Sequence, residues 1–258
     1  MDLKHYGIKG MKWGVRRFQN DDGTLTAKGR QRYGEDRYKD HGDGRIEIQK
    51  GAELQRIIMD NKYSRQNLDG MTYASVRKSD NNAYMTMFGK PGESRVLKLN
   101  AKTELKSPSV DEAASIFFKL AKENPTVMKE YKDAMYIPDE KQFQKEVDQI
   151  LKGNTSKNQN LYERYFYLNH LLVYDEYMPN AKQMYFNELK KNGYNMLRDD
   201  YDYYTSGGNA SSVILLDGSS SLKIKTDQLV TKSMVKKADK YCEMYAKKGE
   251  EYARRFGI

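Results

Sequence analysis

Two groups of short strand-like runs, separated by a long stretch with helical spacing, constrain the fold of this 258-residue chain. Between residues 45 and 102, runs rich in β-forming residues are separated by Gly-, Pro- and Asn-containing turns. Residues 109–193 instead repeat apolar side chains every three or four positions, as amphipathic helices do. Strand-like runs return at 194–226, and helical spacing returns at 232–256. This order predicts an α+β fold with an antiparallel sheet split by a helical insertion and followed by a long C-terminal helix.

The strand-like runs can be placed individually. In the first group we expect strands at 71–76, 83–88 and 95–99, because these runs are apolar or β-branched and end at turn residues. In the second group we expect strands at 194–197, 213–216 and 222–225. The first three runs would form an antiparallel meander, because only short turns separate them.

Local signals mark the ends of the expected helices. Ser109 and Glu112 have the spacing of a capping box, in which each residue satisfies a free backbone N–H at the start of a helix. Pro125 ends that helix or starts the next one. Gly193 has the position of the glycine that commonly follows a helix.

The composition favours a core built from rings and methionine. The mean hydropathy is −0.92, yet the chain has 21 Tyr, 8 Phe and 13 Met. We therefore expect aromatic rings and Met to supply much of the buried surface. The net charge of +9 is compatible with nucleic acid or another acidic partner, and equally with Lys and Arg spread over solvated helix faces.

Several classes of protein and of site are not expected. A single cysteine, Cys242, excludes an internal disulfide and a multi-cysteine metal site, and it is typical of a reducing compartment. No apolar run approaches the roughly 20 residues of a membrane span. The N-terminus lacks the apolar centre of a signal peptide, so we do not expect secretion by that route. No metal-ligand spacing, nucleophile elbow or phosphate-binding lysine motif is present.

The first 17 residues form a basic arm that combines glycines, cations and the only tryptophan. Such a segment suits extended binding in a groove, with its cations directed at acidic groups, or simple packing on its own domain. The residues expected to contact a partner are His5, Gly7, Lys9, Gly10, Lys12, Trp13, Arg16 and Arg17. A short helix would follow the arm. We accordingly divide the chain into a region 1–44 and an α+β domain 45–258.

The stretch HYGIKGMKWGVRRFQNDDGTLTAKGRQRYG, at 5–34, resembles a segment that recurs in phage and prophage proteins of Gram-positive bacteria. The segment often lies at an end of head-associated or otherwise uncharacterised proteins. The resemblance implies a phage-encoded protein, carried in or on the virion or present in the host cytoplasm. Its partner would be a phage structural protein or packaged DNA, and no membrane is expected.

The order of elements in the body resembles phage-borne domains related to ADP-ribosyltransferases. In that family an early-strand Arg holds the NAD phosphates, a Ser-containing strand lines the nicotinamide pocket, and a late Glu stabilises an oxocarbenium-like transition state. The resemblance assigns the first two roles to Arg56 and Ser75. The third would fall to Asp217, a shorter substitute, because no Glu-x-Glu lies near the last strands.

Three functions follow as hypotheses. The first is a virion-associated binding or structural protein without a cofactor, whose basic arm docks on a partner protein or on DNA. The second is an ADP-ribosyltransferase-like effector that uses NAD and acts on a host target, either active or catalytically degenerate. The third is a protein that antagonises a host defence.

Overall fold

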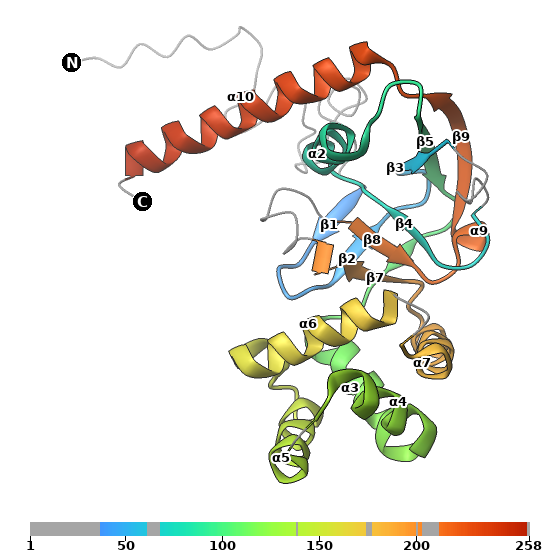
Figure 1. The fold of residues 1–258 in the computed structure, drawn as a ribbon, viewed down its shortest axis with the longest axis vertical. Helices are drawn as coiled ribbons and strands as arrows, with labels where there is room; N and C mark the ends of the chain where they lie inside the picture. The colour runs from blue at the N-terminus through green and yellow to red at the C-terminus, as the bar shows by residue number, and fades with distance from the viewer. Residues whose placement is uncertain are drawn as a thin grey trace, which may run out of the picture.

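The computed structural model describes residues 37–60, 68–137, 139–173, 177–199, 201–202 and 212–256. These residues form a mixed α+β fold, which confirms the predicted class. In Figure 1 the strands occupy the middle of the molecule, and the helices inserted between them form a separate layer at one end. Helix α10 (Lys232–Phe256) is the C-terminal helix that we predicted. It lies at the other end of the molecule, against helix α2 (Lys78–Phe88).

The strands form three small antiparallel sheets rather than the single split sheet that we expected. In their order within each sheet, the strands are β1 (Tyr38–Asp40), β2 (Ile46–Ile48) and β6 (Leu105–Lys106); β3 (Glu53–Met59), β5 (Ser94–Ala101) and β9 (Leu222–Leu229); and β4 (Thr72–Ala74), β8 (Ser212–Leu215) and β7 (Met196–Asp199). Strands from before and after the helical insertion pair directly, as Tyr73 does with Ile214. Two of the three sheets therefore combine strands from before and after the insertion, so the insertion does not divide the sheets into two domains.

Strand β1 lies in the stretch that we assigned to the N-terminal region 1–44. It pairs with β2, and Tyr38 stands opposite Ile48. Residues 38–40 therefore belong to the sheets of the body. The arm itself lies outside the described residues.

The inserted helices begin and end close to the predicted positions. They are α3 (Val110–Glu123), α4 (Pro125–Met135), α5 (Glu140–Leu151), the short 3-10 helix η1 (Thr155–Lys157), α6 (Gln159–Val173) and α7 (Pro179–Lys191). The capping box of Ser109 and Glu112 is present at α3, and Pro125 is the first residue of α4. Gly193 follows α7 with a φ of +84°, a backbone conformation that favours glycine. These local predictions are confirmed.

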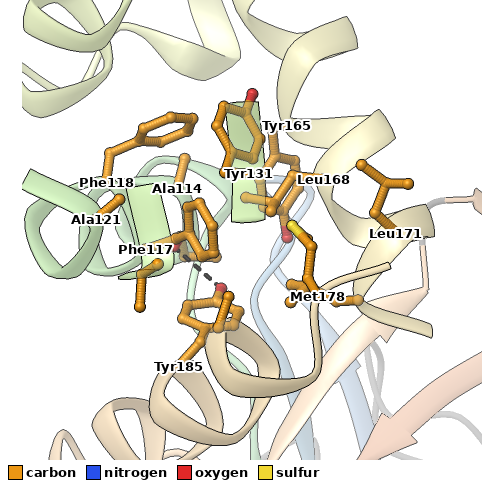
Figure 2. Packing of buried hydrophobic residues seen from close by; sticks show 14 of the residues in the cluster. Ala114, Phe117, Phe118, Ala121, Tyr131, Tyr165, Leu168, Leu171, Met178 and Tyr185 are labelled. Carbon is orange, nitrogen blue, oxygen red and sulfur yellow. Dashed lines mark hydrogen bonds between the residues drawn. The ribbon is translucent and has the colours of Figure 1, made fainter. Parts of the chain in front are cut away.

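Aromatic rings form the centre of the inserted helices, which we call the helical unit. Figure 2 shows rings from different helices pointing toward one another. The ring centroid of Phe117 lies 5.4 Å from those of Tyr131 and Tyr185, in edge-to-face arrangements. The buried Tyr185 hydroxyl donates to the Ala113 carbonyl at 3.0 Å. The expectation of an aromatic core is confirmed for this part of the molecule.

The core between the sheets is aliphatic instead. Its buried members include Leu54, Leu97, Leu99 and Val213, and among the described residues they contain no aromatic ring. Branched aliphatic side chains pack well on a pleated surface, which explains their use between small sheets. The prediction of a ring-rich core is therefore wrong for the sheets.

The strand expected at 83–88 is the second half of helix α2. Ala83 and Met85 are buried on α2, and Met85 belongs to a small apolar cluster with Ala238 of α10. The helix ends at Gly89, where an added Cβ would collide with the carbonyl of Met85. The alternating pattern was misleading because the residues that bury this face of α2 come from a distant part of the chain.

None of the described helices combines the length and apolar character that spanning a bilayer requires.

Candidate functional site

A cleft of about 520 Å³ opens where two of the sheets meet, and we call it the sheet cleft. The two sheets touch there through one bridge, in which Gln55 and Ser75 exchange two backbone hydrogen bonds of 2.8 Å. The sheet cleft is lined by Gln55, Arg56, Ile57, Ile58, Tyr73, Ala74, Ser75, Tyr84, Phe88, Asp199, Tyr201, Asp202 and Ser212. Clefts at such junctions are common ligand sites, because two rigid elements supply groups from different directions.

Ser75 is held firmly at this junction. Only 3% of it is exposed, and its hydroxyl lies 2.6 Å from Asn81 Oδ1 and 3.2 Å from the Gln55 carbonyl. The Gln55 side chain donates in turn to the Asn81 carbonyl at 3.0 Å. These bonds tie β3, β4 and the start of α2 together, so the cleft wall is preorganised.

Two carboxylates form a polar wall of the cleft. Asp199 is buried and accepts hydrogen bonds from the Ser212 hydroxyl and the Asp202 backbone N–H, both at 3.1 Å. Asp202 accepts a hydrogen bond from the Tyr84 hydroxyl. Burial, together with this hydrogen bond, raises the pKa of Tyr84 far above its usual value, so the phenol stays protonated. The carboxylates are thus fixed by partners from α2 and β8.

Half-buried or exposed rings complete the cleft. Phe88 at the end of α2 is 52% exposed, and Tyr84 stacks on it with centroids 6.1 Å apart. Tyr201 stacks on His170 of α6 with centroids 3.9 Å apart. The sheet cleft therefore offers the cation of Arg56, two carboxylates and ring faces. These groups suit a ligand with an anionic group, hydroxyl groups and a flat ring.

The residues named from the sequence fall in three places. Arg56, half-buried on β3, and Ser75 line the same cleft. Asp217 does not line it: its carboxylate caps the short helix α9 (Gly218–Ser221), accepting from the Ser219 backbone N–H at 3.1 Å. Burial alone would raise the pKa of Asp217, but hydrogen bonds from Ser219 and Ser220 hold that pKa below its usual value. The eight residues named in the arm lie outside the described residues.

Sequence reasoning missed the remaining polar groups of the cleft. Tyr84 was assigned to a strand, and no pattern singled out Asp199 or Asp202. One signal was present: Asp199 and Asp200 stand at the end of a strand-like run, where loops often carry functional side chains.

In the described part of the chain, no group of three or more His, Cys, Asp or Glu side chains could hold a metal ion.

Comparison with known proteins adds information for the arm alone. Residues 2–20 match the model of a family of unknown function, DUF7211. The match covers most of the basic arm and stops before the body. No curated protein and no solved structure matches the chain. The sequence is thus similar to DUF7211 over its N-terminal segment.

Proposed function

We propose that this chain is a binding protein whose body takes a phosphate-bearing ligand of the NAD type in the sheet cleft. One observation carries the proposal: Arg56, Ser75 and the carboxylates of Asp199 and Asp202 line a single cleft, although they come from distant segments. The resemblance of the body to ADP-ribosyltransferase-related domains supplies the ligand class.

The chemistry of the cleft matches such a ligand. A guanidinium group pairs with phosphate through two parallel hydrogen bonds, so Arg56 would hold the diphosphate. The carboxylates of Asp199 and Asp202 would accept hydrogen bonds from ribose hydroxyls. Ring faces such as that of Phe88 would stack on a base or on nicotinamide.

Binding is the first function that we propose, and NAD cleavage is the alternative. In the family that the body resembles, a glutamate stabilises positive charge on the sugar, and Asp217 at α9 does not line the cleft. Turnover would therefore need Asp199 or Asp202 in that role. Release of nicotinamide from NAD by the purified protein would establish the enzymatic alternative.

The test is calorimetric titration of NAD into the wild type, Arg56→Ala and Arg45→Ala. Arg45 is an exposed arginine outside the cleft, paired with Asp43, so its loss controls for the change in charge. We expect Arg56→Ala to weaken binding about tenfold or more, as for the loss of a charge-assisted hydrogen bond, and Arg45→Ala to leave it unchanged. Equal affinities for all three proteins would rule out a ligand held by Arg56.

A second candidate function concerns the arm. We propose that it docks the protein on a phage structural protein or on packaged DNA, in a virion or in its host. Support comes from the resemblance of residues 5–34 to a segment of phage and prophage proteins. The match to DUF7211, a family of unknown function, also falls on the arm, at residues 2–20. This segment carries glycines, cations and Trp13, a combination suited to a groove or to phosphate contacts.

Deletion of residues 1–17 tests this docking function. Virion proteins should be recovered from infected cells or purified virions with the full chain and not with the shortened one. Unchanged recovery would assign the contact to the body. If DNA is the partner, affinity should fall steeply as salt rises, because Lys and Arg release counterions from phosphates. Affinity independent of salt would exclude this phosphate contact.

A further inference from the structure

The helical unit contains another hollow, which shares no lining residue with the sheet cleft and which we call the helical pocket. Its volume is about 440 Å³, and it lies between the end of α4 and helices α5 and α6. It is lined by Met135, Tyr136, Ile137, Asp139, Gln142, Phe143, Glu146, Asn160, Glu163, Arg164 and Tyr167. None of the three hypotheses drawn from the sequence uses these residues.

A largely buried ion pair fixes the floor of the helical pocket. Glu146 of α5 pairs with Arg164 of α6, and their side chains are only 14% and 20% exposed. Gln142 donates to the same carboxylate at 3.1 Å, and the Arg164 guanidinium lies over the Phe143 ring, 5.5 Å from its centroid. Burying such a pair is costly and adds little stability, so its presence under an open hollow points to a role beyond packing.

The rim of the pocket combines acidic and aromatic side chains. Asp139 and Glu163 are exposed carboxylates, each also held in place: Asp139 caps α5, and Glu163 accepts from Gln159 at 2.8 Å. Tyr167 is 52% exposed and Tyr136 is 87% exposed. Carboxylates beside ring faces are the groups that bind ammonium and guanidinium ions.

Tyr136 is also held in an unfavourable backbone conformation. Its φ is +45°, and it is the one non-glycine residue with a positive φ in the described part of the chain. Tyr136 closes helix α4 in the left-handed conformation in which many helices end, and for a residue other than glycine this costs about 1 kcal/mol or more. Glycine is the usual residue at such a helix end, so the tyrosine adds an exposed ring to the pocket lining at a cost in backbone strain.

The charge of the helical unit differs from that of the remaining chain. Residues 110–193 hold thirteen Asp and Glu against twelve Lys and Arg, whereas the whole chain has a net charge of +9. The excess of positive charge therefore lies outside the helical unit. A cationic partner would meet least repulsion at this end of the molecule.

We propose that the helical pocket binds a Lys or Arg side chain from a basic segment of a partner protein. The cation would lie between Asp139 and Glu163, and its alkyl stem would pack on Tyr136 and Tyr167. The ion pair beneath keeps the floor polar and rigid. This site is independent of the sheet cleft, and failure of one proposal leaves the other intact.

The test uses the full-length protein and a fluorescein-labelled nonapeptide in which glycine alternates with lysine and arginine. Binding is followed by fluorescence anisotropy at low salt. The double variant Asp139→Asn, Glu163→Gln keeps both side chains able to accept hydrogen bonds and removes two charges. The matched control, Glu123→Gln with Asp133→Asn, removes two exposed charges of the same unit outside the pocket.

We expect the pocket variant to bind the peptide about fivefold to tenfold more weakly than the wild type, and the control variant to match the wild type. Equal weakening by both variants would show a general charge effect and overturn the proposal. So would the absence of binding to the wild type, or unchanged binding by an analogue with glutamine in place of every lysine and arginine.

Tyr136→Gly separates a binding role from a structural one. Glycine adopts the left-handed backbone without strain, so this variant should melt at the same or a higher temperature. It should nevertheless bind the peptide more weakly, because the ring is lost. A variant that binds as tightly as the wild type would remove Tyr136 from the site and contradict the proposed geometry.

Discussion

The core of the helical unit and the sheet cleft use their aromatic residues in opposite ways. In the helical unit, Phe117, Phe118, Tyr131 and Tyr185 are fully or almost fully buried and contact one another. Around the sheets, Tyr73, Tyr84, Phe88 and Tyr201 line a cleft, while aliphatic side chains fill the core. Rings that are not needed for packing remain available for a ligand.

This difference shows where substitutions should affect stability and where they should affect binding. A buried ring stabilises the fold through dispersion contacts and through apolar surface that is removed from water, and its loss leaves a cavity. A ring at a cleft already contacts water on one side. Aromatic residues of the same type should therefore give different results in the two regions, and the following experiments test that contrast, beginning with the largest effect.

Phe117→Ala should lower the free energy of unfolding by about 3–5 kcal/mol, because it removes the ring that contacts Phe118, Tyr131 and Tyr185. Phe88→Ala, at a residue that is 52% exposed, should change it by less than about 1 kcal/mol. Urea unfolding followed by circular dichroism measures both. Similar losses for the two variants would contradict the division between packing rings and cleft rings.

Alkaline pH should destabilise the helical unit through its buried tyrosines. Burial raises the pKa of Tyr185 in the folded state, whereas an unfolded tyrosine loses its proton near pH 10. The resulting contribution of Tyr185 to the free energy of unfolding is complete below about pH 10. It is lost as pH rises, by at most about 1.4 kcal/mol per pH unit for one tyrosine. Tyr185→Phe should reduce the slope of stability against pH between about 10 and 12. An unchanged slope would exclude Tyr185 as a contributor.

Tyr84→Phe should cost about 1.5–3 kcal/mol, the usual cost of losing a hydrogen bond to a charged group, here the Asp202 carboxylate. It should also weaken NAD binding, because Asp202 loses a group that orients it. The matched substitution Tyr185→Phe removes a bond to a neutral carbonyl, so its cost at neutral pH should be smaller, about 0.5–1.5 kcal/mol. A larger loss of stability in Tyr185→Phe than in Tyr84→Phe would show that the Tyr84 hydroxyl does not hold Asp202 in place.

Asp217→Ala should lower stability by about 0.5–2 kcal/mol, because it removes the cap of α9. Asp217→Asn should cost less, since asparagine also caps helices well. Neither change should alter NAD binding, because Asp217 does not line the sheet cleft. A loss of NAD affinity in Asp217→Asn, with stability maintained, would return Asp217 to the candidate site.

The sequence by itself determined the features that depend on neighbouring residues. The capping box of Ser109 and Glu112, the first residue of α4 and the glycine after α7 act within a few positions of the chain. The alternation of strand-like and helical segments was enough for the α+β class. Resemblance also named Arg56 and Ser75, which the structure brings to one cleft.

Only the tertiary structure decided the features that need distant partners. Residues 83–88 alternate like a strand, yet they are helical because α10 covers Met85 from more than a hundred residues away. Asp199 and Asp202 join Arg56 in the cleft because β8 pairs with β4 across the helical insertion. The sequence pattern records whether a side chain is apolar or charged, but which surface covers it depends on contacts between segments far apart in the chain.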